Sequence, residues 1–455
     1  MSSVALAADQ DRLFPADPAV RAIARDLHGL VDHRPILSTH GHVDPAMLAA
    51  DAPFPDPAAL LVSRDHYVTR LLHAGGVPLD LLLRGDPRDV WRALCDGWPA
   101  FAGTASGYWL SGTLHGLFGL TDDPAPRHFD EIAALLATPE FRPRALYRRF
   151  GIEVLATTDD PLDPLTAHEA LAADGLRVLP TFRPDAYTRA DRPGWAGAVE
   201  RLIAEAGEGH ADYSGFRRAL EHRRAFFIER GAVSADHGVR TPATARLTDR
   251  EAATLFDELR AGDTARADLF EAHMLYQSAR MSVDDGLVMT VHPGIHRDHH
   301  PATRATFGPD TGHDIPVRTD FTAALQPLLA DFGTAPGFHL VLYTTDETTY
   351  SRELAPLAGF YPAVYLGAPW WFLDAPDAMR RFREAVTETA GFSRSSGFVD
   401  DTRGFCSIPV RHDAARRVEA GVLARLVVER RLTEARAAEV IVDLIDGAPR
   451  RVFKL

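Results

Sequence analysis

The stretch Pro35-Ile36-Leu37-Ser38-Thr39-His40-Gly41-His42 is a short apolar run that ends in two histidines. In a β-strand, side chains two positions apart point to the same side. His40 and His42 therefore hold two imidazole nitrogens where one metal ion can bind both. A second short run ends much later in Asp400-Asp401, and a carboxylate from there would complete a three-ligand centre.

Eight short β-like runs can be placed along the chain, and helical patterns separate most of them. The runs cover residues 36–39, 153–157, 177–182, 232–235, 286–291, 338–344, 363–366 and 397–399. Strands that alternate with helices favour a parallel sheet, and eight such units favour a (β/α)₈ barrel. We therefore predict an α/β protein of the TIM-barrel type.

The gap between the first two runs, residues 45–150, is far too long for one crossover helix. We expect a mostly helical insertion there, packed as a lid over the mouth of a single barrel domain that spans residues 1–455. Helical patterns cover 67–73 and 88–94 within it, and 219–228, 249–261, 373–389 and 416–432 beyond it.

Composition narrows the class of protein. The chain of 455 residues has a net charge of −14, which argues against nucleic acid and anionic membranes as partners. Its two cysteines fit no metal-ligand spacing and indicate a reducing compartment. The N-terminus lacks the features of a signal peptide, and no apolar run approaches the ~18 residues of a membrane helix. We expect a soluble cytoplasmic enzyme that forms a homo-oligomer.

The only lysine is Lys454, next to the last residue. The chain therefore has no internal lysine for a Schiff base, a P-loop or a carboxylated lysine that bridges two metals. It also has no Gly-rich loop for a dinucleotide. We expect one divalent metal ion and no nucleotide cofactor.

Every predicted strand is followed by polar or aromatic residues, and in a barrel these strand ends form the active-site face. The residues are His40-Gly41-His42, Thr157-Thr158-Asp159-Asp160, Arg183-Pro184-Asp185, Asp236-His237-Gly238, His292-Pro293-Gly294, Thr345-Asp346-Glu347, Trp370-Trp371 and Asp401-Thr402-Arg403. A purely structural barrel gives no reason for such residues at all eight places.

Zinc binds imidazole nitrogen and carboxylate oxygen, and a catalytic site keeps one position open. His40, His42 and Asp401 meet this requirement. His292 could be a further ligand, a substrate contact or a structural histidine. His237 could equally be a hydrogen-bonded histidine in a tight turn.

Arg183 and Arg403 follow strands that face the same cavity. Arginine binds carboxylates through a planar fork, so the two indicate an anionic substrate such as a sugar acid. The alternative for each is a salt bridge to a neighbouring aspartate, Asp185 or Asp401. Trp370 could wall the pocket against a sugar ring or belong to the core.

His66 and Tyr67 open the first helical stretch of the insertion. Such a pair on a lid can return a proton to an intermediate once the site closes. From spacing alone, side-chain packing is the more ordinary role for both residues.

Taken in order, these blocks resemble the uronate isomerases, a branch of the amidohydrolase superfamily. The matching segments are Ser38-Thr39-His40-Gly41-His42-Val43-Asp44-Pro45, Asp65-His66-Tyr67, Leu155-Ala156-Thr157-Thr158-Asp159-Asp160-Pro161, Pro180-Thr181-Phe182-Arg183-Pro184-Asp185, Ser234-Ala235-Asp236-His237-Gly238, Gly308-Pro309-Asp310-Thr311-Gly312, Gly367-Ala368-Pro369-Trp370-Trp371-Phe372 and Asp400-Asp401-Thr402-Arg403-Gly404-Phe405. The resemblance runs over nearly the whole chain.

The resemblance implies a distorted (β/α)₈ barrel with a helical insertion after the first strand and one divalent metal, usually zinc. It implies interconversion of D-glucuronate with D-fructuronate, or of D-galacturonate with D-tagaturonate. The implied roles are metal binding by His40, His42 and Asp401, substrate binding by Arg183 and Arg403, and proton transfer by His66 and Tyr67.

One block departs from the family pattern. The chain has His292-Pro293-Gly294-Ile295-His296-Arg297-Asp298, so it keeps Arg297 for substrate binding but has an acid where an amide is usual. An acid at Asp298 could weaken the binding of a carboxylate substrate.

We therefore expect an aldose–ketose isomerase that acts on a hexuronate, with Asp401 as the base at C2 and Tyr67 or His66 as the proton donor at C1. The alternative is a mononuclear metal hydrolase on the same scaffold that cleaves a lactone or an amide, with His292 as a ligand.

Overall fold

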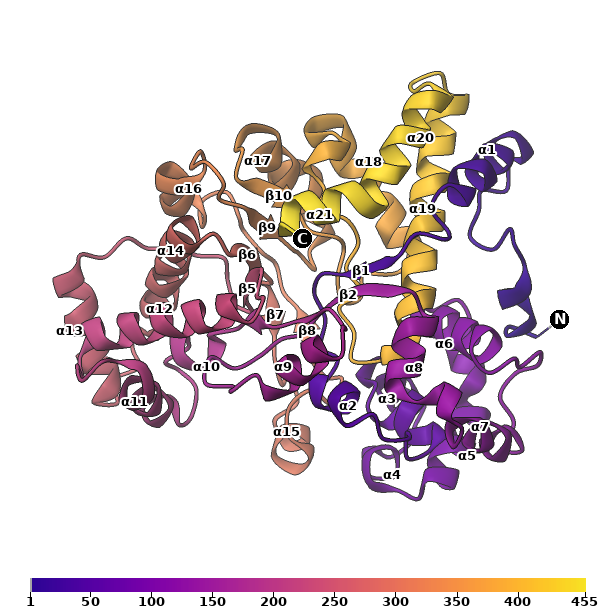
Figure 1. Cartoon of the computed structure of the whole chain (residues 1–455), viewed down its shortest axis with the longest axis horizontal. Coiled ribbons are helices and arrows are strands. Elements are labelled where there is room, and N and C mark those ends of the chain that lie inside the picture. Colours follow the sequence, from indigo (N-terminus) through magenta and orange to yellow (C-terminus); the bar gives the residue numbers. More distant parts are fainter. Residues whose placement is uncertain (1) are drawn as a thin grey trace.

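Parallel strands surrounded by helices form the centre of the molecule, which a computed structural model describes from residue 2 to residue 455 (Figure 1). The strands are β1 (Ile36–Ser38), β2 (Ile152–Ala156), β3 (Val178–Leu179), β4 (Thr181–Phe182), β5 (Ser234–His237), β6 (Val288–Val291), β7 (Ile295–His296), β8 (Ile315–Pro316), β9 (Leu340–Leu342) and β10 (Val364–Leu366). All except the β7–β8 hairpin pair in parallel, which confirms the predicted α/β class.

The parallel strands follow one another in chain order. One sheet has the order β1-β2-β3 and the other β4-β5-β6-β9-β10. Only Pro180 separates β3 from β4, and proline lacks the N–H that a continuous ladder needs. A parallel bridge from Asp159 to Phe182 continues the pairing of the β2 segment past this break. The order is that of a (β/α)₈ barrel.

The eighth predicted strand, at residues 397–399, is wrong, because these residues form no strand. Gly397 has φ 83° and Asp401 has φ 41°, both in the left-handed region, so extended backbone ends on each side of the run. A single parallel bridge between Leu366 and Ser395 is what remains of the expected pairing with β10.

Single hydrogen bonds take the place of the missing ladder. Ser396 N–H donates to the oxygen of Leu366 at 2.9 Å, and on the other side His42 N–H donates to the oxygen of Thr402 at 3.0 Å. Within residues 2–455 the strands therefore do not form a closed regular barrel. The segment between Ser396 and Thr402, which connects the β10 side to the β1 side of the gap in the barrel, also carries Asp401.

A helical segment lies between β1 and β2. Its helices are α2 (Pro45–Ala50), α3 (His66–Ala74), α4 (Leu79–Arg84), α5 (Pro87–Gly97), α6 (Ala105–Gly116), α7 (His128–Leu136) and α8 (Pro143–Arg149). Their apolar side chains form one core that includes Trp91 and Leu114. In Figure 1 these helices gather at the lower right, below the first two strands.

The other helices pack around the strands. They are α1 (Pro18–Gly29), α9 (Thr166–Ala173), α10 (Asp185–Thr188), α11 (Trp195–Ala206), α12 (Tyr213–Glu229), α13 (Asp249–Arg260), α14 (Ala267–Asp285), α15 (Pro301–Phe307), α16 (Gln326–Phe332), α17 (Ala355–Phe360), α18 (Pro376–Ala390), α19 (Ile408–Val428), α20 (Glu434–Val442) and α21 (Ala448–Phe453). None of the helices described combines the length and apolar composition that crossing a membrane requires.

An aromatic cluster holds α11 to α14 together beside the sheet. Phe256 on α13 is fully buried, and its ring lies 5.2 Å from Phe216 and 6.0 Å from both Trp195 and Phe270, measured between ring centroids. The packing of the four helices therefore depends on the ring of Phe256, which contacts the other three rings.

Replacement of Phe256 by alanine should lower the free energy of unfolding by about 3–5 kcal/mol, because it removes buried apolar surface and leaves a cavity. The matched control is Phe360→Ala, which removes a ring that is 74% exposed. Urea unfolding followed by tryptophan fluorescence compares the two. Equal midpoints for both variants would contradict the assigned packing.

Candidate active site

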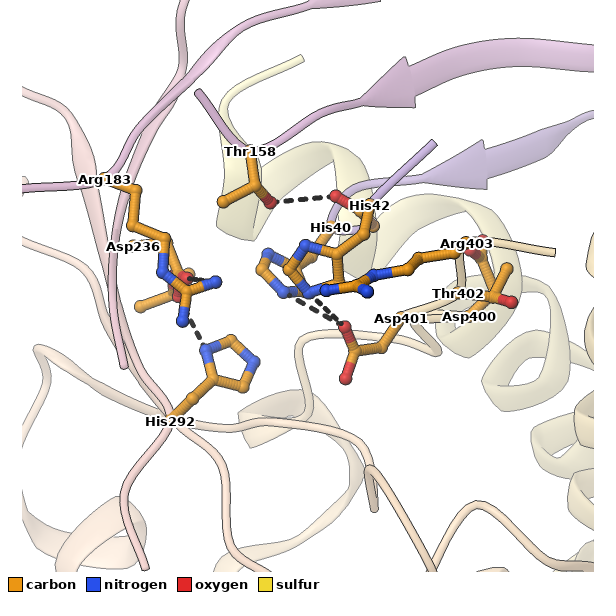
Figure 2. A network of polar contacts seen from close by, with 12 residues as sticks. His40, His42, Thr158, Arg183, Asp236, His292, Asp400, Asp401, Thr402 and Arg403 are labelled. Carbon is orange, nitrogen blue, oxygen red and sulfur yellow. Dashed lines mark hydrogen bonds and ion pairs between the residues drawn. The ribbon is translucent and has the colours of Figure 1, made fainter. Parts of the chain in front are cut away.

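His40, His42 and Asp401 meet at one point beyond the end of β1 (Figure 2). The Asp401 Oδ1 atom lies 3.4 Å from Nε2 of His40 and 3.0 Å from Nε2 of His42. The His40 side chain is buried and that of His42 is partly exposed, so the cluster has a closed side and an open side. The two distant sequence segments are thus joined.

The backbone around Gly41 fixes this geometry. The Thr158 hydroxyl donates to the oxygen of Gly41 at 2.9 Å. On the other side, a Cβ at Gly41 would lie 3.4 Å from Oδ1 of Asp400, so the segment after β1 packs directly on the segment that carries Asp401. Asp400 is buried and its Oδ2 lies 3.0 Å from Nε2 of His412 on α19.

The charges at this point favour an ionised Asp401 carboxylate and a neutral His42 imidazole, whereas at His40 the carboxylates of Asp236 and Asp401 outweigh burial and raise the pKa. Burial would raise the pKa of Asp401, but the neighbouring His40 and His42 side chains outweigh it and hold that pKa well below its ordinary value. Burial lowers the pKa of His42 to about 4. A metal ion requires an ionised carboxylate and neutral imidazoles as ligands, so its binding would displace the proton of His40.

The donor set fits a divalent metal ion. One donor atom from each of the three residues lies within 4.8 Å of the other two, and Oδ1 of Asp401 is buried without a hydrogen-bond partner. Zinc bonds of about 2.0–2.2 Å in a tetrahedral site separate ligand atoms by about 3.4 Å, close to the distances from Asp401. Two imidazoles and a carboxylate leave a fourth position open.

A second group of possible ligands shares His40 and adds Asp236 and His292. Nδ1 of His292 lies 2.6 Å from Oδ1 of Asp236, and its ring stacks on that of His40 with centroids 4.4 Å apart. Nε2 of His292 is buried without a partner. His237 belongs to neither group among the described residues, and burial lowers its pKa to about 4.

A pocket of about 580 Å³, counted out to its open mouth, lies over this cluster. All ten residues that the sequence singled out line it: His40, His42, His66, Tyr67, Arg183, His292, Arg297, Trp370, Asp401 and Arg403. The structure therefore brings the ten candidates together in one pocket.

Both strand-end arginines already have carboxylate partners. Nε of Arg183 donates to Oδ2 of Asp185 at 2.8 Å, and its Nη1 lies 3.4 Å from Oδ2 of Asp236. Arg403 Nη2 donates to Oδ2 of Asp310 at 2.9 Å. The salt-bridge alternative is thus present for each, but with Asp310, not Asp401, as the partner of Arg403.

The β7–β8 hairpin and its tip supply residues that sequence reasoning missed. Asp310, which lies in this excursion and lines the pocket, is the counterion of Arg403. Arg297 donates to Oδ2 of Asp314 at 3.1 Å and lies over the Trp371 ring. The Gly308–Gly312 block was visible in the sequence, but its residues contained no sign of which arginine Asp310 would face.

Asp298, the acid in the divergent block, does not line the pocket. Its Oδ2 lies 3.0 Å from Nε of Arg304 on α15, and its backbone N–H donates to Oδ1 of Asp314 at 2.7 Å. The carboxylate of Asp298 is therefore paired with Arg304, which lies in the same segment between β7 and β8.

His66 and Tyr67 form the wall of the pocket nearest the helical segment. Their rings stack with centroids 4.9 Å apart, and His66 also lies 5.5 Å from the Trp371 ring. Trp370 contacts the edge of His292 at 4.7 Å. Burial raises the pKa of Tyr67 well above its ordinary value, so its phenol keeps its proton.

Comparison with known proteins gives a consistent result. The model of the glucuronate isomerase family matches residues 19–448. The uronate isomerase of Corynebacterium efficiens is 52% identical, with 100% of each chain covered. A crystal structure of glucuronate isomerase from Caulobacter crescentus superposes with a TM-score of 0.96 at 47% identity, and covers 98% of this chain and 96% of its own.

A more distant relative preserves the same arrangement. The structure of uronate isomerase from Thermotoga maritima superposes with a TM-score of 0.93 at 27% identity, and covers 98% of this chain and 99% of its own. Similarity of this extent over the whole length shows that the chain belongs to the uronate (glucuronate) isomerase family.

Proposed function

We propose that this protein is an aldose–ketose isomerase that interconverts D-glucuronate with D-fructuronate and D-galacturonate with D-tagaturonate. The observation that carries the proposal is one pocket in which Asp401 lies against two histidines while Arg183, Arg297 and Arg403 line the surrounding wall. A carboxylate base and several cations in one small cavity suit an anionic sugar with an acidic C2 proton.

His40, His42 and Asp401 would hold the metal ion, and zinc is the ion we propose because the donors are imidazole and carboxylate. A bound divalent ion would act as a Lewis acid towards the substrate oxygens. Arg403 and Arg183 would bind the substrate carboxylate, with Asp310 and Asp185 holding their side chains in place before the substrate arrives.

The reaction moves one proton from C2 to C1. Asp401 takes the C2 proton of the open-chain aldose and gives a proton to the carbonyl oxygen at C1, which produces an enediol and restores the carboxylate. Tyr67 then donates its phenolic proton to C1, and the C2 hydroxyl returns its proton to the phenolate, which leaves the ketose and restores Tyr67. His66, stacked on Tyr67, is the second candidate donor. No oxidant or reductant enters the balance.

The hydrolase alternative is not supported by the relatives, which at about half identity over the full length are uronate isomerases. The bond of its Nδ1 to the buried carboxylate of Asp236 holds the His292 ring in place at the pocket wall. We propose that it orients His40 and the substrate.

The direct test is incubation of the purified protein with D-glucuronate or D-galacturonate in the presence of zinc. Ketose formation, followed by ¹H NMR, is expected with at least one of the two. Hydrolysis of lactone or amide substrates with no change in either uronate would contradict the proposal.

Asp401→Asn should reduce kcat by at least about a thousandfold, because the amide can neither accept the C2 proton nor act as a charged ligand. The matched control is Asp298→Asn, whose carboxylate is paired with Arg304 outside the pocket. Steady-state kinetics and circular dichroism measure activity and folding. Near-normal turnover by folded Asp401→Asn would remove this residue from the mechanism.

Arg183→Lys should raise KM for uronates roughly tenfold with a much smaller effect on kcat, since a point charge cannot replace a bidentate fork. Arg230→Lys is the control, because Arg230 pairs with Glu169 away from the pocket. Initial rates across a range of substrate concentrations separate the two constants. An unchanged KM would assign Arg183 to its salt bridge with Asp185 alone.

A further inference from the structure

Asp374 and Arg411 lie near Tyr67, and the proposed reaction gives neither of them a role. Its ring packs edge-on against Trp109 of α6, with centroids 5.4 Å apart. After burial itself, the charge with the largest effect on its phenol is that of Asp374, followed by Arg411 and Asp401. Asp374 follows the Trp370-Trp371 wall of the pocket, and Arg411 lies in the first turn of α19.

Arg411 joins the elements that meet behind Tyr67. Its Nη1 donates to Oδ2 of Asp374 at 2.8 Å, and its guanidinium lies 3.5 Å over the Trp109 ring and 5.5 Å from the Tyr67 ring. Its Nε also donates to the Ser407 hydroxyl at 3.1 Å. One cation therefore contacts α19, the pocket wall and two aromatic rings of the helical segment.

The close approach of α6 to α19 fixes the distance between these rings and Arg411. A Cβ at Gly112 of α6 would lie 2.5 Å from Cγ1 of Val410, so only glycine allows the two helices to come this near. Figure 1 shows the lower end of α19 beside α6. This close packing of the helices places the Trp109 ring against the guanidinium of Arg411.

Stability alone does not account for this ion pair. The Arg411 side chain is 1% exposed and that of Asp374 is 3% exposed. Both keep a buried polar atom without a hydrogen-bond partner, Nη2 of Arg411 and Oδ1 of Asp374. A buried pair with unsatisfied atoms is seldom more stable than apolar residues of the same volume. Its place beside Tyr67 points to a role in the reaction.

We propose that Asp374 and Arg411 are positioning residues for Tyr67, which hold its phenol where it can protonate C1 of the enediol. The inference rests on the isomerase function proposed above. Once Asp401 has taken the C2 proton, the enediol either returns to the aldose by reprotonation at C2 or goes on to the ketose by protonation at C1. A loosely held Tyr67 would slow only the second path.

The test separates these two paths in D₂O. The wild type, Asp374→Asn and Tyr67→Phe are incubated with D-glucuronate, and NMR measures both the deuterium gained at C2 of recovered aldose and the ketose formed. In Asp374→Asn the ratio of exchange to isomerisation should rise about tenfold or more, with the exchange rate within about threefold of wild type. Tyr67→Phe should shift the ratio in the same direction.

A double variant that combines Asp374→Asn with Tyr67→Phe should shift the ratio of exchange to isomerisation no further than Tyr67→Phe does, because both changes act through the phenol of Tyr67. Asp285→Asn is the control: it weakens the ion pair with buried Arg224, at 2.6 Å, away from the pocket, and should leave the ratio unchanged. Metal content is measured in every sample, so that loss of the ion is recognised.

A parallel fall of exchange and isomerisation in Asp374→Asn would overturn the inference, as would an unchanged ratio, since a structural role predicts either. If the wild type shows neither exchange nor ketose, the proposed function itself fails. The two failures are thus distinguished by the wild type alone.

Discussion

The site depends on the contact between the segment after β1 and the segment that ends at Arg403. A single backbone hydrogen bond, from His42 N–H to the oxygen of Thr402, replaces a strand ladder at this point. Because no regular strand pairing supports this hydrogen bond, side chains must hold the two segments together. The Thr158 hydroxyl holds Gly41 from one side, and buried Asp400 packs against it from the other. Displacement of either segment would separate Asp401 from its two histidines.

Irregular backbone at this place has a cost and a use. Asp401 adopts φ 41°, a conformation that non-glycine residues rarely occupy, and such strain is found where function requires it. The turn aims the Asp401 carboxylate back at His40 and His42, away from the path an eighth strand would have taken. Arg411 reinforces the turn, since its Nη1 also lies 3.3 Å from the oxygen of Asp400.

Much of the fold and of the pocket could be predicted from local sequence. The strand-end rule selected seven of the ten candidates that line the pocket, because parallel strands in chain order bring their C-terminal ends to one face. His66, Tyr67 and Arg297 came instead from the helical insertion and from the family resemblance. The eighth strand could not be excluded, since an apolar run does not reveal the left-handed residues on either side of it. Asp310 and the Asp374–Arg411 pair escaped notice because their partners lie far away in the sequence. Which charged residues become partners depends on tertiary packing, and the spacing of residues along the sequence does not reveal it.

Anomalous diffraction at the zinc absorption edge, from crystals grown with zinc, tests the central claim most directly. The account predicts one anomalous peak within about 2.0–2.2 Å of Nε2 of His40, Nε2 of His42 and Oδ1 of Asp401. A peak held instead by Asp236 and His292, or a second peak of similar height there, would contradict it.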